Sequence, residues 1–142
     1  METIALVRVL VDTSVWIAFF RKQEPYHSTL TRLIDNEQVS CIGVILAELM
    51  QGAKSEKELA VLNDFTSVFS FVPENPGLWA EAGRLSFRLR RKGITVGLAD
   101  CFIATAATQT GHQLASLDAH FDLLGQTVRL TRYQFPPLSL IS

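Results

Sequence analysis

The stretch that decides the fold is RVLVDTS, residues 8–14. Its first four residues form a short run that is nearly all apolar and rich in β-branched side chains, which is typical of a parallel strand buried on both faces. Asp12 stands at the carboxyl end of this strand, and Thr13 or Ser14 can cap a helix that we expect to run through about Arg21. A buried strand that ends on a carboxylate and turns into a helix indicates an α/β fold.

The remainder of the chain continues the alternation of strands and helices. We expect further strands at residues 39–42, 68–72, 113–117 and 128–130, and helices at 26–36, 44–52, 55–67, 76–92 and 98–110. Strands separated by helices predict a parallel central sheet of about five strands with helices on both faces. Pro136 and Pro137 cannot join a central strand, so we expect one domain over residues 1–133 and a tail over 134–142.

Composition narrows the class of protein. A chain of 142 residues fits one domain, and 48% hydrophobic against 19% charged residues excludes a disordered chain. We see no pattern of a signal peptide or a membrane span, and Cys41 and Cys101 lie in apolar runs, so we expect buried free thiols in a cytoplasmic protein. The net charge is −1, so nucleic-acid binding would need a local basic patch or a bound metal.

Four carboxylates in apolar surroundings are the candidate functional residues. Asp12 and Asp118 follow strands, whereas Glu48 and Asp100 lie in apolar helices. In an open α/β sheet the ligand site lies beyond the carboxyl ends of the strands. Each acid, taken alone, also has a structural explanation: a helix cap, a turn, a solvated helix face or a favourable contact with a helix dipole.

Taken together, the four acids indicate a metal site. Carboxylates gathered at one rim repel one another, and a hard divalent cation between them relieves that repulsion. Oxygen ligands favour Mg²⁺ or Mn²⁺, and Ser116 can orient a carboxylate or a metal-bound water. His27, His112 and His120 lack the spacing of a zinc site, so we interpret them as surface or structural residues, and Asp122 as a solvated surface residue.

Four segments carry a resemblance to a known family. They are VDTSVWI at 11–17, ELMQG at 48–52, DCFIATA at 100–106 and SLDAHF at 116–121. Their order and spacing resemble those of PIN-domain ribonucleases, and the whole chain resembles the VapC-type toxins of type II toxin-antitoxin systems. The resemblance implies a PIN-like fold with an acidic pocket supported by small polar side chains. It implies that four acids form the pocket: Asp12, Glu48, Asp100 and Asp118. It implies that three hydroxyl residues support them: Thr13, Ser14 and Ser116. Ser116 stands where threonine is more usual in the family.

The same resemblance implies an activity and partners. It implies an endoribonuclease that uses Mg²⁺, with Mn²⁺ as a possible substitute, and hydrolyses RNA by a metal-activated water. It further implies a homodimer neutralised by a VapB-type antitoxin, whose C-terminal region crosses the active groove. Two alternatives remain: a PIN nuclease of RNA processing outside toxin-antitoxin systems, and a catalytically silent PIN-like binding module. The presence of all four acids disfavours the silent module.

Basic and aromatic side chains add less specific candidates. Arg84, Arg88 and Arg91 share one face of the helix expected at 76–92, where they would either contact RNA phosphates or form a solvated basic face. Four aromatic residues are expected mostly in the core, although an exposed subset could serve dimerisation or receive an antitoxin segment: Trp16, Phe19, Phe20 and Trp79.

Overall fold

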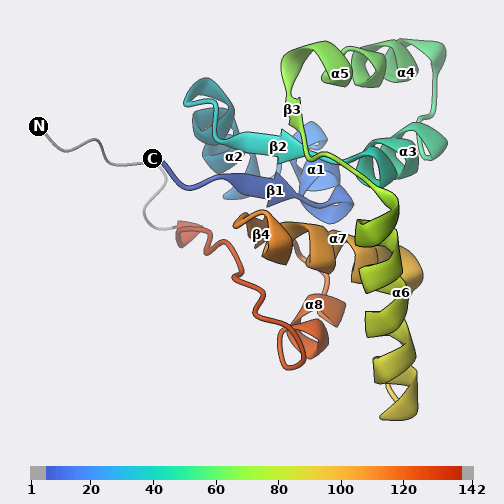
Figure 1. Ribbon diagram of the computed structural model, residues 1–142. Helices are drawn as coiled ribbons and strands as arrows, with labels where there is room; N and C mark the ends of the chain where they lie inside the picture. The colour runs from blue at the N-terminus through green and yellow to red at the C-terminus, as the bar shows by residue number, and fades with distance from the viewer. Residues whose placement is uncertain (1–5, 139–142) are drawn as a thin grey trace, which may run out of the picture.

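The computed structural model describes residues 6–138, which form helices around a small central sheet (Figure 1). The first half of the chain alternates as the sequence predicts, with each strand running directly into a helix. Its elements are β1 (Val9–Val11), α1 (Thr13–Phe20), α2 (Tyr26–Asp35), β2 (Val39–Cys41) and α3 (Gly43–Gln51). Gly52 caps the end of α3, as expected from its position after the last apolar residues of that helix.

The second half of the chain differs from expectation in several elements, among them the short helix α8 (His120–Leu124), which was not expected. Its elements are α4 (Glu56–Asn63), α5 (Phe65–Val68), β3 (Ser70–Phe71), α6 (Pro76–Arg91), α7 (Leu98–Gln109), β4 (Gln113–Ala115) and α8 (His120–Leu124). The prediction of a single helix over residues 55–67 is wrong, because the helix is interrupted at Asp64 and the segment forms α4 and α5. The break turns the buried Phe65 ring onto Trp16, with 4.9 Å between ring centroids. Tertiary packing thus overrides the local helical pattern.

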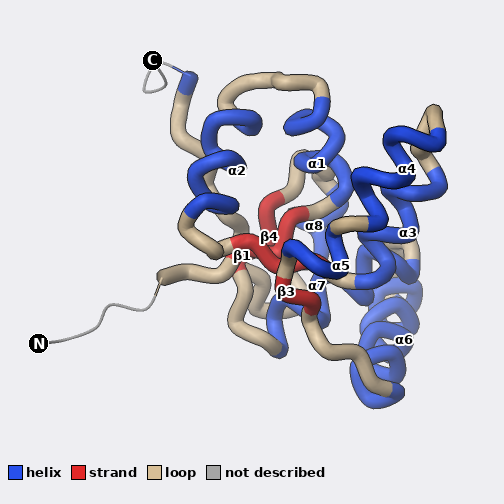
Figure 2. Tube along the Cα trace, turned by 90° about the horizontal axis from the view of Figure 1, so that it is seen from above, coloured by secondary structure: helices blue, strands red, loops and turns tan. Residues whose placement is uncertain are grey.

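The sheet has four parallel strands in the order β3-β2-β1-β4. β1 lies inside the sheet, and its three residues Val9–Val11 are fully buried, which explains its unbroken apolar sequence. Helices α1 and α2 lie on one side of the sheet and α6 and α7 on the other (Figure 2). The parallel sheet with helices on both faces is therefore confirmed.

The strand expected at residues 128–130 does not form. There the backbone bends on itself, since the amide of Leu130 donates to the carbonyl of Val128 at 2.9 Å. The chain reaches the sheet two residues later, where an isolated parallel bridge pairs Leu114 with Arg132. The expected fifth strand is thus reduced to a bridge beside β4.

The core is one continuous cluster of apolar side chains between the sheet and its helices. Cys41 and Cys101 belong to it as buried free thiols, as expected, and burial raises the pKa of Cys41 to about 11. Among residues 6–138 no helix is both long and apolar enough to cross a membrane. The division into a domain at 1–133 and a tail at 134–142 stays a prediction.

A network of polar side chains connects the strands near their amino-terminal ends, away from the carboxyl ends. Ser40 in β2 accepts from the Arg8 guanidinium at 2.9 Å and lies 2.9 Å from Nε2 of His112. Thr110 donates its hydroxyl to the carbonyl of Ala106, so it can only accept from Nδ1 of His112, 2.7 Å away. Nδ1 of His112 therefore carries a proton, and in the neutral ring Nε2 accepts from Ser40. Burial lowers the pKa of His112, and the charge of Arg8 lowers it further.

This network predicts a pH dependence of stability. In the unfolded chain His112 takes up a proton near pH 6.5, whereas the folded protein takes it up only at lower pH, so unfolding binds a proton in that interval. The free energy of unfolding should therefore fall as the pH drops below about 6.5, and His112→Gln should remove part of that fall. Urea denaturation of both proteins at pH 7.5 and pH 5.5 measures the difference. Equal losses in the two proteins would show that His112 is not responsible.

Candidate metal-binding active site

Asp12 follows β1 and its carboxylate is buried, with 6% of the residue exposed. Oδ1 accepts a hydrogen bond from the amide of Thr13 at 2.7 Å, so Asp12 caps α1. Oδ2 accepts from the hydroxyls of Ser14 at 3.0 Å and Ser116 at 2.6 Å. A buried carboxylate needs such partners, because its charge loses the solvation of water. The three donors fix both oxygens of Asp12 in place.

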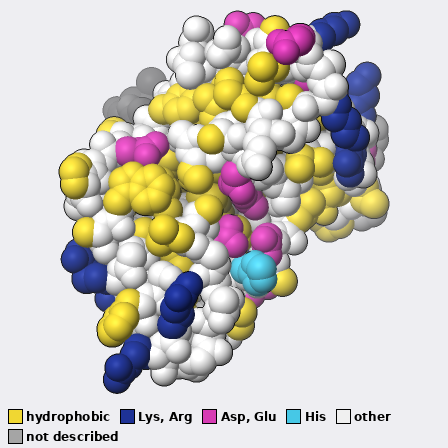
Figure 3. Space-filling model, turned by 90° about the vertical axis from the view of Figure 1, so that its right-hand side faces the viewer, with side chains coloured by type: hydrophobic (Ala, Val, Ile, Leu, Met, Phe, Trp, Pro, Cys, Tyr) yellow, Lys and Arg dark blue, Asp and Glu magenta, His cyan; other side chains and the backbone are white. Residues whose placement is uncertain are grey.

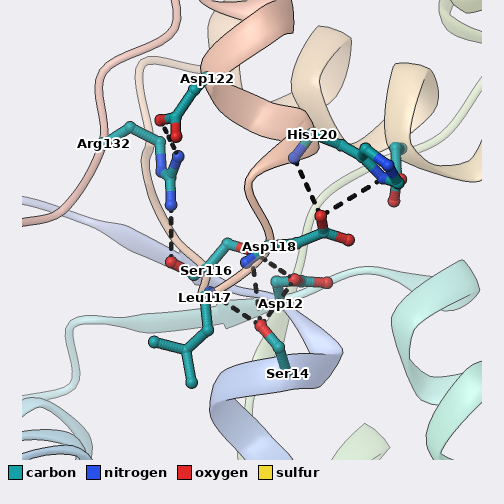
Figure 4. Close-up of polar contacts among 9 residues, drawn as sticks. Asp12, Ser14, Ser116, Leu117, Asp118, His120, Asp122 and Arg132 are labelled. Carbon is teal, nitrogen blue, oxygen red and sulfur yellow. Dashed lines mark hydrogen bonds and ion pairs between the residues drawn. The ribbon is translucent and has the colours of Figure 1, made fainter. Parts of the chain in front are cut away.

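The two serines connect Asp12 to the loop after β4 (Figure 4). Ser14 Oγ accepts from the amide of Leu117 at 2.9 Å, and Ser116 Oγ accepts from the amide of Asp118 at 3.0 Å. Each hydroxyl therefore donates to Asp12 and accepts from the backbone around Asp118. The position of one carboxylate is thereby coupled to the position of the other.

Glu48 and Asp100 reach the same region from two helices. Glu48 in α3 accepts from the Thr13 hydroxyl at 3.2 Å. Burial raises the pKa of Glu48, and the charges of Asp12 and Asp100 raise it further, against a lowering by the Thr13 bond. Burial likewise raises the pKa of Asp100 in α7, with further increases from the charges of Asp118 and Asp12. The four predicted acids therefore lie within electrostatic reach of one another.

His120 also lies at this site, which the sequence analysis did not anticipate. Its Nδ1 is 3.3 Å from Oδ1 of Asp118 and 3.5 Å from Oδ2 of Asp100. The side chain is 55% exposed, so it is a surface residue, as interpreted, but one placed beside two of the predicted acids. Figure 3 shows a group of acidic side chains with a histidine beside it on one face of the molecule. The available signal in the sequence was its position two residues after Asp118.

The donor atoms suit a divalent cation. Asp100, Asp118 and His120 each place one donor atom within 4.8 Å of the other two. Among residues 6–138, these side chains form a group spaced closely enough to share an ion. Asp12 and Glu48 are linked to this trio through charge and through hydrogen bonds. Burial is the main cause of the raised pKa values of Glu48 and Asp100, and the neighbouring negative charges that add to it are charges that a cation would neutralise.

Arg132 is a site residue that sequence reasoning missed. Its guanidinium donates to the carbonyl of Ser116 at 2.6 Å and to Oδ1 of Asp122 at 2.7 Å (Figure 4). Asp122 is 73% exposed, as expected for a surface residue. Arg132 therefore supports the backbone of the residue that donates to Asp12. Its sequence position, ten residues after Asp122 and outside any motif, carries no signal of that contact.

The basic residues of α6 form local contacts on the surface. Arg84 pairs with Glu81 one turn earlier, and the guanidinium of Arg91 lies 5.9 Å from the centre of the Phe87 ring. Basic side chains in the last turn also interact favourably with the helix dipole. Contact of Arg84, Arg88 and Arg91 with RNA stays a prediction.

A family model described as the PIN domain matches residues 9–126 of the chain. The chain therefore belongs to the PIN-domain family. It is similar to the VapC ribonuclease Mb1587 of Mycobacterium bovis, with 26% identity over 132 residues that cover 89% of this chain and 98% of that relative. It is also similar to ribonuclease VapC1 of Methanocaldococcus jannaschii, with 27% identity over 118 residues that cover 82% and 81% of the two chains.

Solved structures agree on the fold. The chain is similar to one in the crystal structure of VapBC2 from Rickettsia felis bound to a DNA fragment from their promoter, with a TM-score of 0.73 and 20% identity. The match covers 92% of this chain and 100% of that chain. The PIN-like fold and the resemblance to VapC-type proteins are thus confirmed.

The contacts of Arg132 predict its effect on stability. Arg132→Met leaves the half-buried carbonyl of Ser116 without its donor, which should lower the free energy of unfolding by about 1–3 kcal/mol. Asp122→Asn, the matched control, disturbs a surface pair and should change that free energy by less than about 1 kcal/mol. Urea denaturation measures both. Similar effects of the two substitutions would show that the contact with Ser116 contributes nothing beyond the surface pair.

Proposed function

We propose that the chain is a divalent-metal-dependent endoribonuclease and the toxin component of a VapBC-type toxin-antitoxin pair. The observation that carries the proposal is the convergence of Asp12, Glu48, Asp100 and Asp118, from four separate segments, at the carboxyl end of the parallel sheet. The similar proteins support it, since they are named as VapC ribonucleases and as a VapBC complex. A silent binding module would have no need to keep four carboxylates that repel one another.

Asp100 and Asp118 would hold the ion together with Asp12 and Glu48, and Mg²⁺ or Mn²⁺ fits their oxygen atoms. When bound, such an ion polarises the phosphodiester, lowers the pKa of a water molecule and stabilises the leaving oxygen. The remaining side chains act by positioning. Ser116 and Ser14 hold Oδ2 of Asp12, which fixes the orientation of that carboxylate without rearrangement during the reaction.

Thr13 has a corresponding role for the opposite wall of the site. Its hydroxyl donates to Oε1 of Glu48, while its amide donates to Oδ1 of Asp12. One residue therefore sets the spacing between a carboxylate on a strand end and another on a helix. The bound phosphodiester would meet acids already held in place, which lowers the entropic cost of reaching the reactive geometry.

An apolar pocket of about 500 Å³ adjoins the acidic site and supports the antitoxin as partner. It extends from Thr13 and Glu48 to apolar side chains of α1 and α4, among them Ile17, Phe20 and Val61. These three side chains are 39%, 45% and 51% exposed, an apolar surface of the kind that partner segments cover. The VapB-type antitoxin would lay its C-terminal region here, across the entrance to the acids. The resemblance further supports a homodimer acting in the cytoplasm.

Substitution of single acids tests the site. Asp12→Asn and Asp100→Asn each remove a charge at nearly constant volume, so cleavage of RNA should fall by about 100-fold or more, together with growth inhibition on expression, while the fold is kept. Asp122→Asn is the matched control and should keep most activity, because its carboxylate is exposed and pairs with Arg132. Circular dichroism checks the fold of each variant. An inactive Asp122→Asn beside an active Asp118→Asn would reverse the assignment of the fourth acid.

The ends of the RNA products test the nucleophile. The site has no pair of imidazoles to act as base and acid in an attack by the ribose 2′-hydroxyl, because His120 lies there, whereas His112 precedes β4 at the opposite end and His27 stacks on Phe19. Water should therefore attack, leaving a 5′-phosphate and a free 3′-hydroxyl, and EDTA should stop cleavage until Mg²⁺ or Mn²⁺ is restored. Mass spectrometry of the fragments measures the ends. Cyclic 2′,3′-phosphates, or cleavage that persists in EDTA, would refute the proposal.

A further inference from the structure

The imidazole of His120 is directed at the acids by the first turn of its own helix. Its backbone amide donates to Oδ1 of Asp118 at 2.9 Å, in the turn that precedes α8, and this bond holds His120 beside the same carboxylate (Figure 4). From there Nδ1 lies 3.3 Å from Oδ1 of Asp118 and 3.5 Å from Oδ2 of Asp100. Asp100 comes from a different helix, so the ring lies between two carboxylates that the fold brings together.

The fold does not need the His120 side chain. α8 is anchored by Phe121 and Leu124, which are both fully buried in the core. The histidine ring projects from the helix and is half-exposed, so it contributes little apolar burial. Its placement therefore calls for an explanation in the chemistry of the site.

The separations fit ligands of one ion better than hydrogen-bond partners. A charge-assisted hydrogen bond between nitrogen and a carboxylate oxygen measures about 2.7–2.9 Å, which is shorter than both distances to Nδ1. Two donors that each bind a metal at about 2.1 Å lie roughly 3.0 Å apart in octahedral and roughly 3.4 Å apart in tetrahedral coordination. The two measured distances of 3.3 and 3.5 Å lie near that range.

We infer that His120 is a nitrogen ligand of the ion held by Asp100 and Asp118, and that it shifts the preference of the site from Mg²⁺ towards Mn²⁺. The inference rests on the proposed function, because it concerns the same metal site. Mg²⁺ takes oxygen ligands almost exclusively, whereas first-row transition ions accept imidazole nitrogen readily. A site of carboxylates alone would leave the choice to the supply of each ion. One imidazole gives the protein a chemical means of distinguishing them.

Metal binding to the purified full chain tests this inference without reference to catalysis. Isothermal titration with Mn²⁺ and with Mg²⁺ compares the unsubstituted protein with His120→Asn, which removes the imidazole and keeps a small polar side chain. The matched control is His27→Gln, which removes an imidazole on α2 that stacks on Phe19. We expect His120→Asn to weaken Mn²⁺ binding by about tenfold or more and Mg²⁺ binding far less. His27→Gln should change neither.

Pulsed electron paramagnetic resonance of bound Mn²⁺ gives a direct readout of the ligand. Modulation from a coordinated ¹⁴N nucleus should be present in the unsubstituted protein and in His27→Gln, and absent in His120→Asn at saturating Mn²⁺. Modulation that persists in His120→Asn, or equal weakening of Mn²⁺ and Mg²⁺, would overturn the role of His120 and leave a metal-dependent ribonuclease intact. Failure of both ions to bind the unsubstituted protein would refute the metal requirement of the proposed function, and this inference with it.

Discussion

The burial of the Asp12 carboxylate is the constraint on which the rest of the site depends. An ionised group that is almost closed to solvent must recover its lost hydration from hydrogen bonds, and Asp12 does so through Thr13, Ser14 and Ser116. Thr13 and Ser14 follow β1, and Ser116 follows β4. These two strands pair in parallel, with Val11 opposite Ala115. The parallel pairing of these two strands therefore has an electrostatic as well as a backbone component.

Hydroxyl groups suit this position because one hydroxyl donates and accepts at once. Ser116 donates to Asp12 and accepts from the amide of Asp118, so the same atom satisfies a buried charge and fixes the next acid. The arrangement takes carboxylates out of water and gathers their charges, which costs stability: burial raises the pKa of Glu48 and of Asp100, and neighbouring acids raise both further. A continuous apolar core offsets that cost. Active sites commonly hold such unfavourable charge because their function requires it.

Features coded by local pattern were predictable from the sequence, and features produced by tertiary contact were not. β1 and the positions of the four acids follow from apolar runs interrupted by single carboxylates. The break at Asp64 was not predicted, because the apolar spacing runs on past Asn63 and Asp64, two residues that turns favour, and the packing of Phe65 against Trp16 decides the outcome. The expected strand at 128–130 failed for a similar reason, since α8 and its following turn determine where the chain returns to the sheet.

His120 and Arg132 escaped prediction because both act through the segment that follows β4. That segment leaves the sheet at Ser116, packs Phe121 and Leu124 into the core, and returns at Arg132, whose guanidinium binds the carbonyl of Ser116. The segment is thus closed on itself, and its two ends meet beside the acids. Asp12 and Ser116 are positioned by paired strands and Asp118 by its bond to Ser116, whereas His120 is positioned by a five-residue helix. Strand pairing therefore determines where the acids meet, and the packing of α8 determines that the His120 nitrogen lies beside them.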